Sequence, residues 1–314
     1  MSSRASRAGP RGSTARTIGQ AKLNLFLHVL AREASGYHQL ETLFCRLELG
    51  DEVTIRADGR GRWLDCSGEA LPADGLGPVE RNLAWRAAVA FSEAAGWPND
   101  WAIEVRKRIP VGGGLGGGSA DAGAVLRCLN ALAPNPLSAD RLLAVAAGLG
   151  ADVPFLAFDQ PFALAWGRGE RMLALPALPT AEVTLVCFPF GVATPAAFAW
   201  IDADRGSGTV PPVSLDVAGL NTWQRLAALA HNDFEGVVVR RHPDIARVLD
   251  ELRRDLSADR GAIALLTGSG STVALVSTAS GDHERARDGR LDGVASRLVA
   301  TRTATAVVGV EVSG

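Results

Sequence analysis

The sequence predicts an α+β fold divided into two domains. Its 314 residues exceed the roughly 100–200 residues of a typical domain. A strand-like segment, a glycine-rich loop and a helix-like segment follow one another at residues 101–132, and the hydrophobic pattern changes between Gly167 and Pro176. We therefore expect residues 18–170 to form the N-terminal domain and residues 171–314 to form the C-terminal domain.

The composition is that of an ordinary soluble globular protein. Hydrophobic residues make up 47% and charged residues 21% of the chain. The net charge of −2 gives no general attraction to nucleic acid or to an anionic membrane surface. There is no uncharged apolar run of the roughly 18 residues that a membrane-spanning helix needs. We expect no nucleic-acid partner and no membrane partner.

The four cysteines, which are far apart in the sequence, indicate reduced thiols. No CxxC pair and no HxxxH pattern occurs, so the spacings of common zinc and redox motifs are missing. Free thiols are typical of proteins in a reducing compartment, and we expect a cytoplasmic location.

The first 17 residues, MSSRASRAGPRGSTART, contain four arginines and no acidic residue. This composition is shared by organelle transit peptides and by disordered extensions, whereas the apolar stretch of a secretory signal is missing. We predict that residues 1–17 form a disordered tail rich in arginine and serine.

The first element of the N-terminal domain is a strand at residues 21–30, AKLNLFLHVL. Leu23 and Leu25 alternate with Lys22 and Asn24, which predicts a half-buried strand whose polar face lines a cleft. By the same criteria the domain continues with strands at residues 51–55 and 101–105 and helices at residues 81–95, 119–132 and 138–149.

The C-terminal domain is predicted to begin with a strand. The expected elements are a strand at residues 183–188, a loop at 202–220, helices at 222–230 and 243–256, a strand–turn–strand unit at 262–276, and a charged, solvated loop at 281–293. The sequence contains no internal repeat.

The glycine-rich loop, VGGGLGGGS at residues 111–119, has the properties of an anion cradle. Unpaired N–H groups at a helix N-terminus carry partial positive charge, and glycine has no Cβ to keep a phosphate away. Ser119 occupies the expected N-cap position, and Asp121 would lie in the first turn, where its charge suits the helix dipole.

Two other classes of protein use related features. Gly112, Gly114 and Gly117 satisfy the GxGxxG pattern of a dinucleotide-binding oxidoreductase, but six closely spaced glycines make that match weak. The lysine that ends a P-loop is absent. A nucleic-acid binder that uses the basic tail is disfavoured by the net charge.

Several motifs carry a resemblance to a known family. The pattern P-x-G-G-G-L-G-G-G-S-A-D resembles that of the GHMP kinases. Residues 21–44, which include GYH, together with LGADVPF, NDFE and TGSGST, resemble in order the motifs of the 4-diphosphocytidyl-2-C-methyl-D-erythritol kinases. Ser35 departs from the family, which usually has an acidic residue before GYH. A GHMP kinase for another small alcohol is the alternative, and Tyr37-His38 argues against it.

The resemblance implies a two-domain GHMP kinase fold with its active site in the cleft between an N-terminal ATP-binding domain and a C-terminal substrate domain. It also implies transfer of the γ-phosphoryl group of ATP to the 2-hydroxyl of 4-diphosphocytidyl-2-C-methyl-D-erythritol (CDP-methylerythritol), in non-mevalonate isoprenoid synthesis. Mg²⁺ is expected to be carried mostly by the ATP phosphates, without dedicated protein ligands. The oligomeric state, monomer or homodimer, stays open.

The resemblance also assigns roles to individual residues. Asp152 is the expected base, and Lys22 keeps Asp152 ionised and stabilises charge on the attacking oxygen. The expected ATP-binding residues are Asn82, Lys107, Pro110, Gly112, Gly113, Gly114, Leu115, Gly116, Gly117, Gly118 and Ser119. The expected substrate-binding residues are Asn24, Tyr37, which stacks on cytosine, His38, which hydrogen-bonds the base, and Thr194, Gly268, Ser269 and Gly270.

For several of these residues a purely structural role stays open. The structural alternatives are a helix cap for Ser119, a turn residue or a solvated charge for Asn82 and Lys107, and a hairpin turn for residues 267–271.

Overall fold

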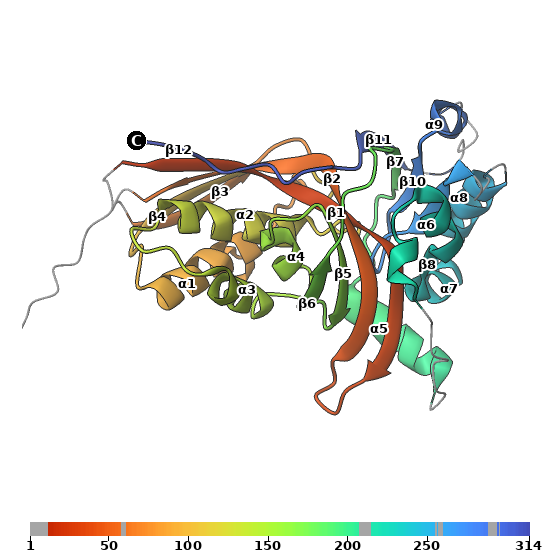
Figure 1. Cartoon of the computed structure of the whole chain (residues 1–314), viewed down its shortest axis with the longest axis horizontal. Helices are drawn as coiled ribbons and strands as arrows, with labels where there is room; N and C mark the ends of the chain where they lie inside the picture. The colour runs from red at the N-terminus through yellow and green to blue at the C-terminus, as the bar shows by residue number, and fades with distance from the viewer. Residues whose placement is uncertain are drawn as a thin grey trace, which may run out of the picture.

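The computed structural model describes residues 12–57, 61–206, 215–254, 256, 260–287, 294 and 296–314. Within these residues the chain forms two β-sheets, each covered by helices (Figure 1). The mixed α and β content and the two separate sheets confirm the predicted fold class. No helix in the described ranges has both the length and the apolar character needed to span a membrane.

The first sheet contains eight strands among the described residues. Five of them lie in the order β12-β1-β2-β4-β3. In addition, β5 pairs with β2, β6 pairs with β5, and β8 pairs with β1. These strands are β1 (Thr14–Arg32), β2 (His38–Arg56), β3 (Arg62–Ser67), β4 (Trp101–Arg106), β5 (Phe162–Gly167), β6 (Arg171–Ala174), β8 (His231–Asn232) and β12 (Glu311–Ser313). The helices on its inner face are α1 (Leu83–Ala95), α2 (Gly117–Leu132), α3 (Ala139–Ala147) and α4 (Val153–Ala157), with the short helix η1 (Val79–Arg81) before α1.

The second sheet has four strands among the described residues, in the order β11-β7-β10-β9. They are β7 (Glu182–Cys187), β9 (Ile263–Leu266), β10 (Val273–Ser277) and β11 (Arg297–Arg302). The associated helices are α5 (Thr194–Arg205), η2 (Val217–Gly219), α6 (Trp223–Leu229), α7 (Asp233–Val239), α8 (Pro243–Arg253) and α9 (Ser280–Arg287). One apolar core contains residues from both sheets, such as Leu23 and Leu185, so the two halves share a continuous interior.

The long hairpin of β1 and β2 runs from the end of the first sheet where β12 lies to a tip beside α5 (Figure 1). Each strand has 19 residues, which corresponds to about 60 Å of extended chain. The pairing is interrupted by irregularities at three places, one of them between Asn24 and Phe26. An extra residue at such a bulge moves the following side chains to the other face, so the cleft is lined by Lys22 and Asn24 and then by Leu27. Regular alternation had placed Leu27 on the opposite face.

Burial of β1 also differs from the prediction. We expected a half-buried strand, but residues 19–27 are buried without interruption. Helix α2 packs on one side of this strand with backbone contact, since a Cβ on Gly19 would lie 2.8 Å from the carbonyl oxygen of Ala120. Two polar side chains of this buried stretch, Lys22 and Asn24, line the cleft.

Several predicted boundaries are wrong. Thr14–Thr17 of the predicted tail belong to β1, whose pairing with β12 and β2 satisfies their backbone, while residues 1–11 of that tail lie outside the described residues. The first sheet passes residue 170, because β6 and the C-terminal strand β12 both belong to it. Much of the strand β2 was missed, because only residues 51–55 of it were predicted.

Two predicted loops contain helices. Helix α5 extends to Arg205 and η2 occupies part of the remainder of the predicted 202–220 loop, of which residues 207–214 lie outside the described residues. Helix α9 lies in the predicted solvated loop at 281–293, where Asp282 and His283 are buried. The α9 sequence, SGDHERAR, is polar, so tertiary contacts rather than local apolar periodicity stabilise this helix.

A buried charge cluster fixes α2 and β4 to β2. The Nζ atom of Lys107 lies 2.5 Å from Asp51 Oδ2 and 2.6 Å from Asp121 Oδ2, and all three side chains are buried. Burial alone lowers the pKa of Lys107, but the nearby carboxylates of Asp121 and Asp51 outweigh it and raise the pKa above its ordinary value. Burial also raises the pKa of Asp121 well above its ordinary value, against the attraction of Lys107.

Replacing Gly123 by alanine is expected to destabilise the protein by about 1–3 kcal/mol, since this is the usual cost of overpacking a core. A Cβ there would lie 2.5 Å from the carbonyl carbon of Leu156, which is backbone and can move little. Gly281→Ala is the matched control, because it also lies in a helix but has nothing within 4 Å of its Cβ position. Urea unfolding measures both, and equal midpoints for the two variants would contradict the packing argument.

Replacing Lys107 by methionine is expected to cost about 3–5 kcal/mol of unfolding free energy, because two buried carboxylates lose their counter-charge. Adding Asp121→Asn should recover part of this loss. The control is Arg108→Met, an exposed neighbour paired with Glu52, with an expected change below about 0.5 kcal/mol. A Lys107 variant as stable as the Arg108 variant in urea unfolding would show that the cluster adds no stability.

Candidate active site

A cleft with a volume of about 1410 Å³ gathers every predicted site residue. Its walls come from β1, the start of β2, the glycine loop before α2, the segment that precedes α4, and loops next to the second sheet. The predicted residues are separated by up to about 250 positions in the sequence, as the Lys22 and Gly270 positions illustrate. The fold therefore brings together the set that the sequence motifs identified.

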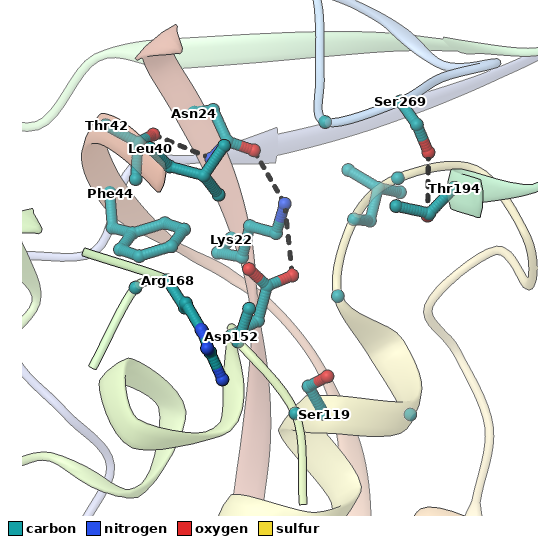
Figure 2. A pocket seen from close by; sticks show the side chains of 18 of the residues that line it. Lys22, Asn24, Leu40, Thr42, Phe44, Ser119, Asp152, Arg168, Thr194 and Ser269 are labelled. Atoms are coloured by element: carbon teal, nitrogen blue, oxygen red, sulfur yellow. Dashed lines mark hydrogen bonds and ion pairs between the residues drawn. The ribbon is translucent and has the colours of Figure 1, made fainter. Parts of the chain in front are cut away.

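The predicted catalytic pair lies in this cleft. Lys22 Nζ is 3.4 Å from Asp152 Oδ2 (Figure 2). The Lys22 side chain is 3% exposed and that of Asp152 is 30% exposed. The lysine is thus enclosed, whereas the carboxylate remains open to a molecule in the cleft.

A chain of hydrogen bonds holds Lys22 in position. Lys22 Nζ donates to Asn24 Oδ1 at 2.6 Å, and Asn24 Nδ2 donates to Thr42 Oγ1 at 2.8 Å. Thr42 in turn donates to the carbonyl oxygen of Phe26 at 2.7 Å. Asn24 lines the cleft as predicted, and its side-chain carboxamide oxygen orients the lysine.

Asp152 is placed by the start of the short helix α4. It occupies the N-cap position, but its side chain makes no capping hydrogen bond, and Pro154 follows in the first turn. A capping aspartate would direct its carboxylate to the backbone of its own helix. The Asp152 carboxylate instead points toward Lys22 (Figure 2).

The glycine loop combines an unusual backbone with very close packing. Gly112, Gly114 and Gly116 have φ values of 78°, 79° and 72°, which side chains of L-residues rarely tolerate. A Cβ on Gly113 would lie 2.3 Å from Thr272 Oγ1, and one on Gly114 would lie 2.2 Å from the carbonyl oxygen of Thr267. The loop therefore rests directly on the 267–272 turn, so this turn braces the loop.

The start of α2 differs from the prediction. The helix begins at Gly117 after Gly116, so Ser119 lies inside the first turn and is not its N-cap. Asp121 lies beyond the first turn and pairs with Lys107, so its expected role as a complement to the helix dipole is wrong. Because glycine at the cap has no side chain, the backbone N–H groups at this end of α2 stay unprotected by a capping group.

Two predicted ATP-binding residues also have structural partners. Asn82 caps α1 by accepting a hydrogen bond from the Ala84 N–H at 2.9 Å. Lys107 lines the cleft, but its ammonium group is engaged by Asp51 and Asp121, so the alternative of a solvated charge is wrong. Direct contact of either residue with a nucleotide stays a prediction.

Tyr37 lies at the open side of the cleft and is 60% exposed. The guanidinium carbon of Arg168 lies 4.2 Å from the centre of its ring. Arg168 is also paired with Glu33 and lies 3.2 Å from Ser35 Oγ, which itself donates to Glu33. Ser35, the position that departs from the family pattern, therefore joins the network that supports Tyr37.

The remaining predicted substrate-binding residues come from β2, α5 and the second glycine turn. His38 stacks against Phe198 with ring centres 4.3 Å apart. Thr194 Oγ1 lies 3.0 Å from Ser269 Oγ, which links the start of α5 to the second glycine turn (Figure 2). Asn232 Nδ2 donates to the carbonyl oxygen of Gly268 at 2.8 Å and so supports the same turn.

The sequence reasoning missed several cleft residues. They are Thr42, Phe44, Arg168 and Phe198, which all line the cleft. A threonine between apolar strand residues is a detectable signal for Thr42. Phe198 and Arg168 resemble ordinary packing and surface residues in the sequence, and only their contacts with His38 and Tyr37 distinguish them.

Oxygen atoms suited to a hard cation occur at two points of the cleft. The Asp152 carboxylate is partly exposed, and the Ser119 hydroxyl has no hydrogen-bond partner in the described part of the chain. Figure 2 shows Ser119 at the start of α2, on the side of the helix nearest Asp152. Such a sparse set fits Mg²⁺, which keeps several waters and takes most of its other ligands from phosphates.

A second group of possible ligands consists of His28, His231 and Asp233. The two imidazole rings are stacked with centres 4.9 Å apart and an interplanar angle of 20°, so their in-plane lone pairs do not converge on one point. Asp233 already binds Arg205 at 2.7 Å and the Val29 N–H at 2.6 Å. Burial raises the pKa of Asp233, but hydrogen bonds from His28, the Val29 N–H, His231 and Arg205 outweigh burial and hold the pKa below its ordinary value, as expected for a structural ion cluster.

Comparison with known proteins gives matches over most of the chain. The family model for the GHMP kinases N terminal domain matches residues 82–164. The 4-diphosphocytidyl-2-C-methyl-D-erythritol kinase of Mycolicibacterium gilvum is 41% identical over 283 residues, which cover 87% of this chain and 84% of that protein. The enzyme of the same name from Geobacter sp. strain M21 is 37% identical over 257 residues, covering 82% and 87%.

Solved structures give the same result. A crystal structure of 4-(cytidine 5′-diphospho)-2C-methyl-D-erythritol kinase matches with a TM-score of 0.70 and 32% identity, covering 92% of this chain and 98% of that one. Homoserine kinase from Cytophaga hutchinsonii, with a TM-score of 0.64 and 17% identity, shares the fold. The chain is a GHMP kinase and belongs to the 4-diphosphocytidyl-2-C-methyl-D-erythritol kinase family.

Proposed function

We propose that this protein is an ATP-dependent kinase that phosphorylates the 2-hydroxyl of 4-diphosphocytidyl-2-C-methyl-D-erythritol, a step of non-mevalonate isoprenoid synthesis. The observation that carries the proposal is the Lys22–Asp152 pair at 3.4 Å in the same cleft as the glycine loop before α2. A kinase of this kind needs a phosphate cradle and a group that takes the hydroxyl proton.

Asp152 is the proposed base. Its carboxylate makes no capping bond and is 30% exposed, so its oxygen atoms are available to the acceptor hydroxyl. As the hydroxyl proton moves to Asp152, the oxygen forms a bond to the γ-phosphorus. The bond from the γ-phosphorus to the β,γ-bridging oxygen breaks, and ADP carries away that electron pair.

Lys22 is the proposed source of positive charge beside the attacking oxygen. Its ammonium group donates to the neutral Asn24, which Thr42 holds in turn, and the carboxylate of Asp152 lies further away, at 3.4 Å. A fixed charge in an enclosed site stabilises developing negative charge with little reorganisation. The contrast with Lys107, whose two carboxylates lie at 2.5 and 2.6 Å, supports different roles for the two lysines.

The glycine loop and the N-terminus of α2 are proposed to hold the ATP phosphates. Gly116 leaves the end of the helix without a capping side chain, and positive φ values fix the shape of the loop. Asn82 and Lys107 would lie at the nucleotide side of the cleft. Ser119 is the residue proposed to reach Mg²⁺, which would be held mostly by the ATP phosphates and would neutralise their charge when it is bound.

The acceptor is proposed to lie against the opposite wall. Tyr37 would stack on the cytosine ring, since one face of a ring fixed by Arg168 offers a flat, exposed platform. His38 would hydrogen-bond the base, and Thr194 with the 268–270 turn would face the diphosphate and the methylerythritol unit. We also infer a cytoplasmic location, which is supported by four cysteines that are all free.

Replacing Asp152 by asparagine is expected to lower kcat by about 100- to 10,000-fold, because the proton acceptor is lost while the side chain keeps its shape. The assay is ³¹P NMR of the protein with Mg-ATP and the cytidine acceptor, in which a new phosphomonoester signal reports transfer. Asp140→Asn, an exposed aspartate on α3, is the control and should retain wild-type activity. If Asp152→Asn kept wild-type activity, Asp152 would not be the base. If the wild type phosphorylated only homoserine or mevalonate, the proposed substrate would be wrong.

Replacing Tyr37 by alanine is expected to raise KM for the acceptor by about tenfold or more with little change in kcat, because a base–aromatic stack contributes about 1–3 kcal/mol. Tyr37→Phe keeps the ring and should stay near the wild-type KM. Steady-state kinetics at saturating ATP measure both. Equal KM values for wild type and Tyr37→Ala would contradict the cytidine assignment.

A further inference from the structure

A second buried cation lies opposite Lys22 in the first sheet. Arg46 on β2 pairs with Lys22 on β1 in the antiparallel register, and directly opposed residues of two strands point to the same face. Both side chains are buried. Two like charges in such a position destabilise a sheet unless each has partners of its own. The partners of Arg46 therefore indicate its role.

Arg46 binds the end of helix α4. Its Nη2 atom donates to the carbonyl oxygens of Phe155 at 2.6 Å and Phe158 at 2.7 Å. Its Nε atom donates to the carbonyl oxygen of Gln160 at 3.1 Å. The guanidinium carbon also lies 4.9 Å from the centre of the Phe155 ring. The hydrogen bonds of this buried cation thus go to backbone carbonyl groups at one end of one short helix.

Helix α4 needs such an anchor. It has only five residues, Val153–Ala157, and a helix of this length has little stability of its own. The last carbonyl groups of a helix lack partners within it, and leaving them buried without a donor costs free energy. Arg46 supplies several donors in one rigid fork, which fixes the direction of the helix as well as its end. Burial lowers the pKa of Arg46 to about 9, which leaves the guanidinium charged at neutral pH.

The other end of α4 carries Asp152. This residue occupies the N-cap position but makes no capping hydrogen bond, so its place beside Lys22 depends on where the helix lies. Phe155 stacks on Phe44 with ring centres 4.8 Å apart, and Lys22 Nζ lies 5.9 Å from the centre of the Phe44 ring. A continuous line of contacts therefore joins Arg46 to Lys22.

We propose that Arg46 is a positioning residue for phosphoryl transfer, which holds the carbonyl end of α4 and thereby sets the distance between Asp152 and Lys22. The inference rests on the proposed function, in which Asp152 is the base. Arg46 is not among the described residues that line the cleft, so it acts on the reaction through the helix. A misplacement of about 1 Å can lower a rate about 100-fold. The loss of Arg46 should therefore change kcat and not KM.

Arg127 on α2 is a matched control. Its Nη1 and Nη2 atoms donate to the carbonyl oxygens of Val308 at 2.7 Å and Ile18 at 3.0 Å. Arg46 and Arg127 thus both bind backbone carbonyl groups, and each has one nitrogen without a partner in the described part of the chain. Of the two, Arg46 is the one bound to α4. The comparison separates an effect on Asp152 from a general loss of stability.

The first experiment measures kcat and the KM values for ATP and the acceptor in Arg46→Met and Arg127→Met, with urea unfolding of both. Each variant should unfold at a lower urea concentration than the wild type, because each loses hydrogen bonds to carbonyl groups. Arg46→Met should lower kcat about 100-fold and leave both KM values within about twofold. Arg127→Met should keep the wild-type kcat. Equal kcat values for the two variants would overturn the inference.

A milder pair of variants keeps the test decisive if the methionine variants do not fold. Arg46→Lys keeps the charge but replaces the planar fork by a single ammonium group, so kcat should fall by a smaller factor, about tenfold. Arg127→Lys is its control and should keep the wild-type kcat. Equal kcat values for the two lysine variants would overturn the inference.

The second experiment is a double-mutant cycle with Asp152→Asn. If Arg46 acts through the Asp152 carboxylate, Arg46→Met should lower kcat by less than about threefold in the Asp152→Asn background, because the group that it positions is already absent. A purely structural role would lower kcat about 100-fold in both backgrounds, and that result would overturn the inference. Arg46→Lys closes the same cycle with its smaller factor.

The outcomes separate this inference from the proposed function. If Asp152→Asn loses activity but the Arg46 variants behave like the Arg127 variants, the role of Arg46 is overturned and the proposed function stands. If Asp152→Asn keeps wild-type activity, the base assignment falls and the role of Arg46 falls with it.

Discussion

The contact between the glycine loop and the 267–272 turn is the constraint on which the cleft depends. It joins the segment before α2 to the segment between β9 and β10, and it leaves no space for a side chain at Gly113 or Gly114. The Thr272 N–H also donates to the Gly113 carbonyl oxygen at 3.2 Å. The glycines allow two backbones to touch, and the same loop is the one proposed to hold the ATP phosphates. The distance across the cleft follows from that contact.

Strand β1 carries Lys22, the lysine of the proposed catalytic pair, and the burial of this strand limits the partners that the charge can have. An ammonium group with little solvent must find partners in the protein. Lys22 has a neutral partner in Asn24 and a more distant carboxylate in Asp152, whereas Lys107 is held between two buried carboxylates. The first arrangement leaves the Asp152 carboxylate partly exposed in the cleft, and the second joins β2, α2 and the end of β4.

On the wall that is proposed to receive the acceptor, each of the two rings, Tyr37 and His38, contacts a charged side chain. Arg168 lies over Tyr37, and Asp202 binds His38. Arg168 lies in the turn between β5 and β6, and Asp202 lies on α5. Each is more than 130 positions away in the sequence from the ring that it contacts. Because each ring is oriented before a ligand arrives, less conformational entropy is lost on binding.

The sequence by itself determined the α+β class, the helices α1, α2 and α8, and part of the set of residues that line the cleft, including Lys22, Asp152 and the glycine loop. Local periodicity and motif order were sufficient, because both depend on neighbours along the chain. Only the tertiary structure decided that β1 carries bulges, that β12 returns to the first sheet, and that Lys107 binds Asp51 and Asp121. Lys107 and Asp51 are separated by 56 positions. Such pairings depend on which segments meet in space, and no spacing along the chain encodes that.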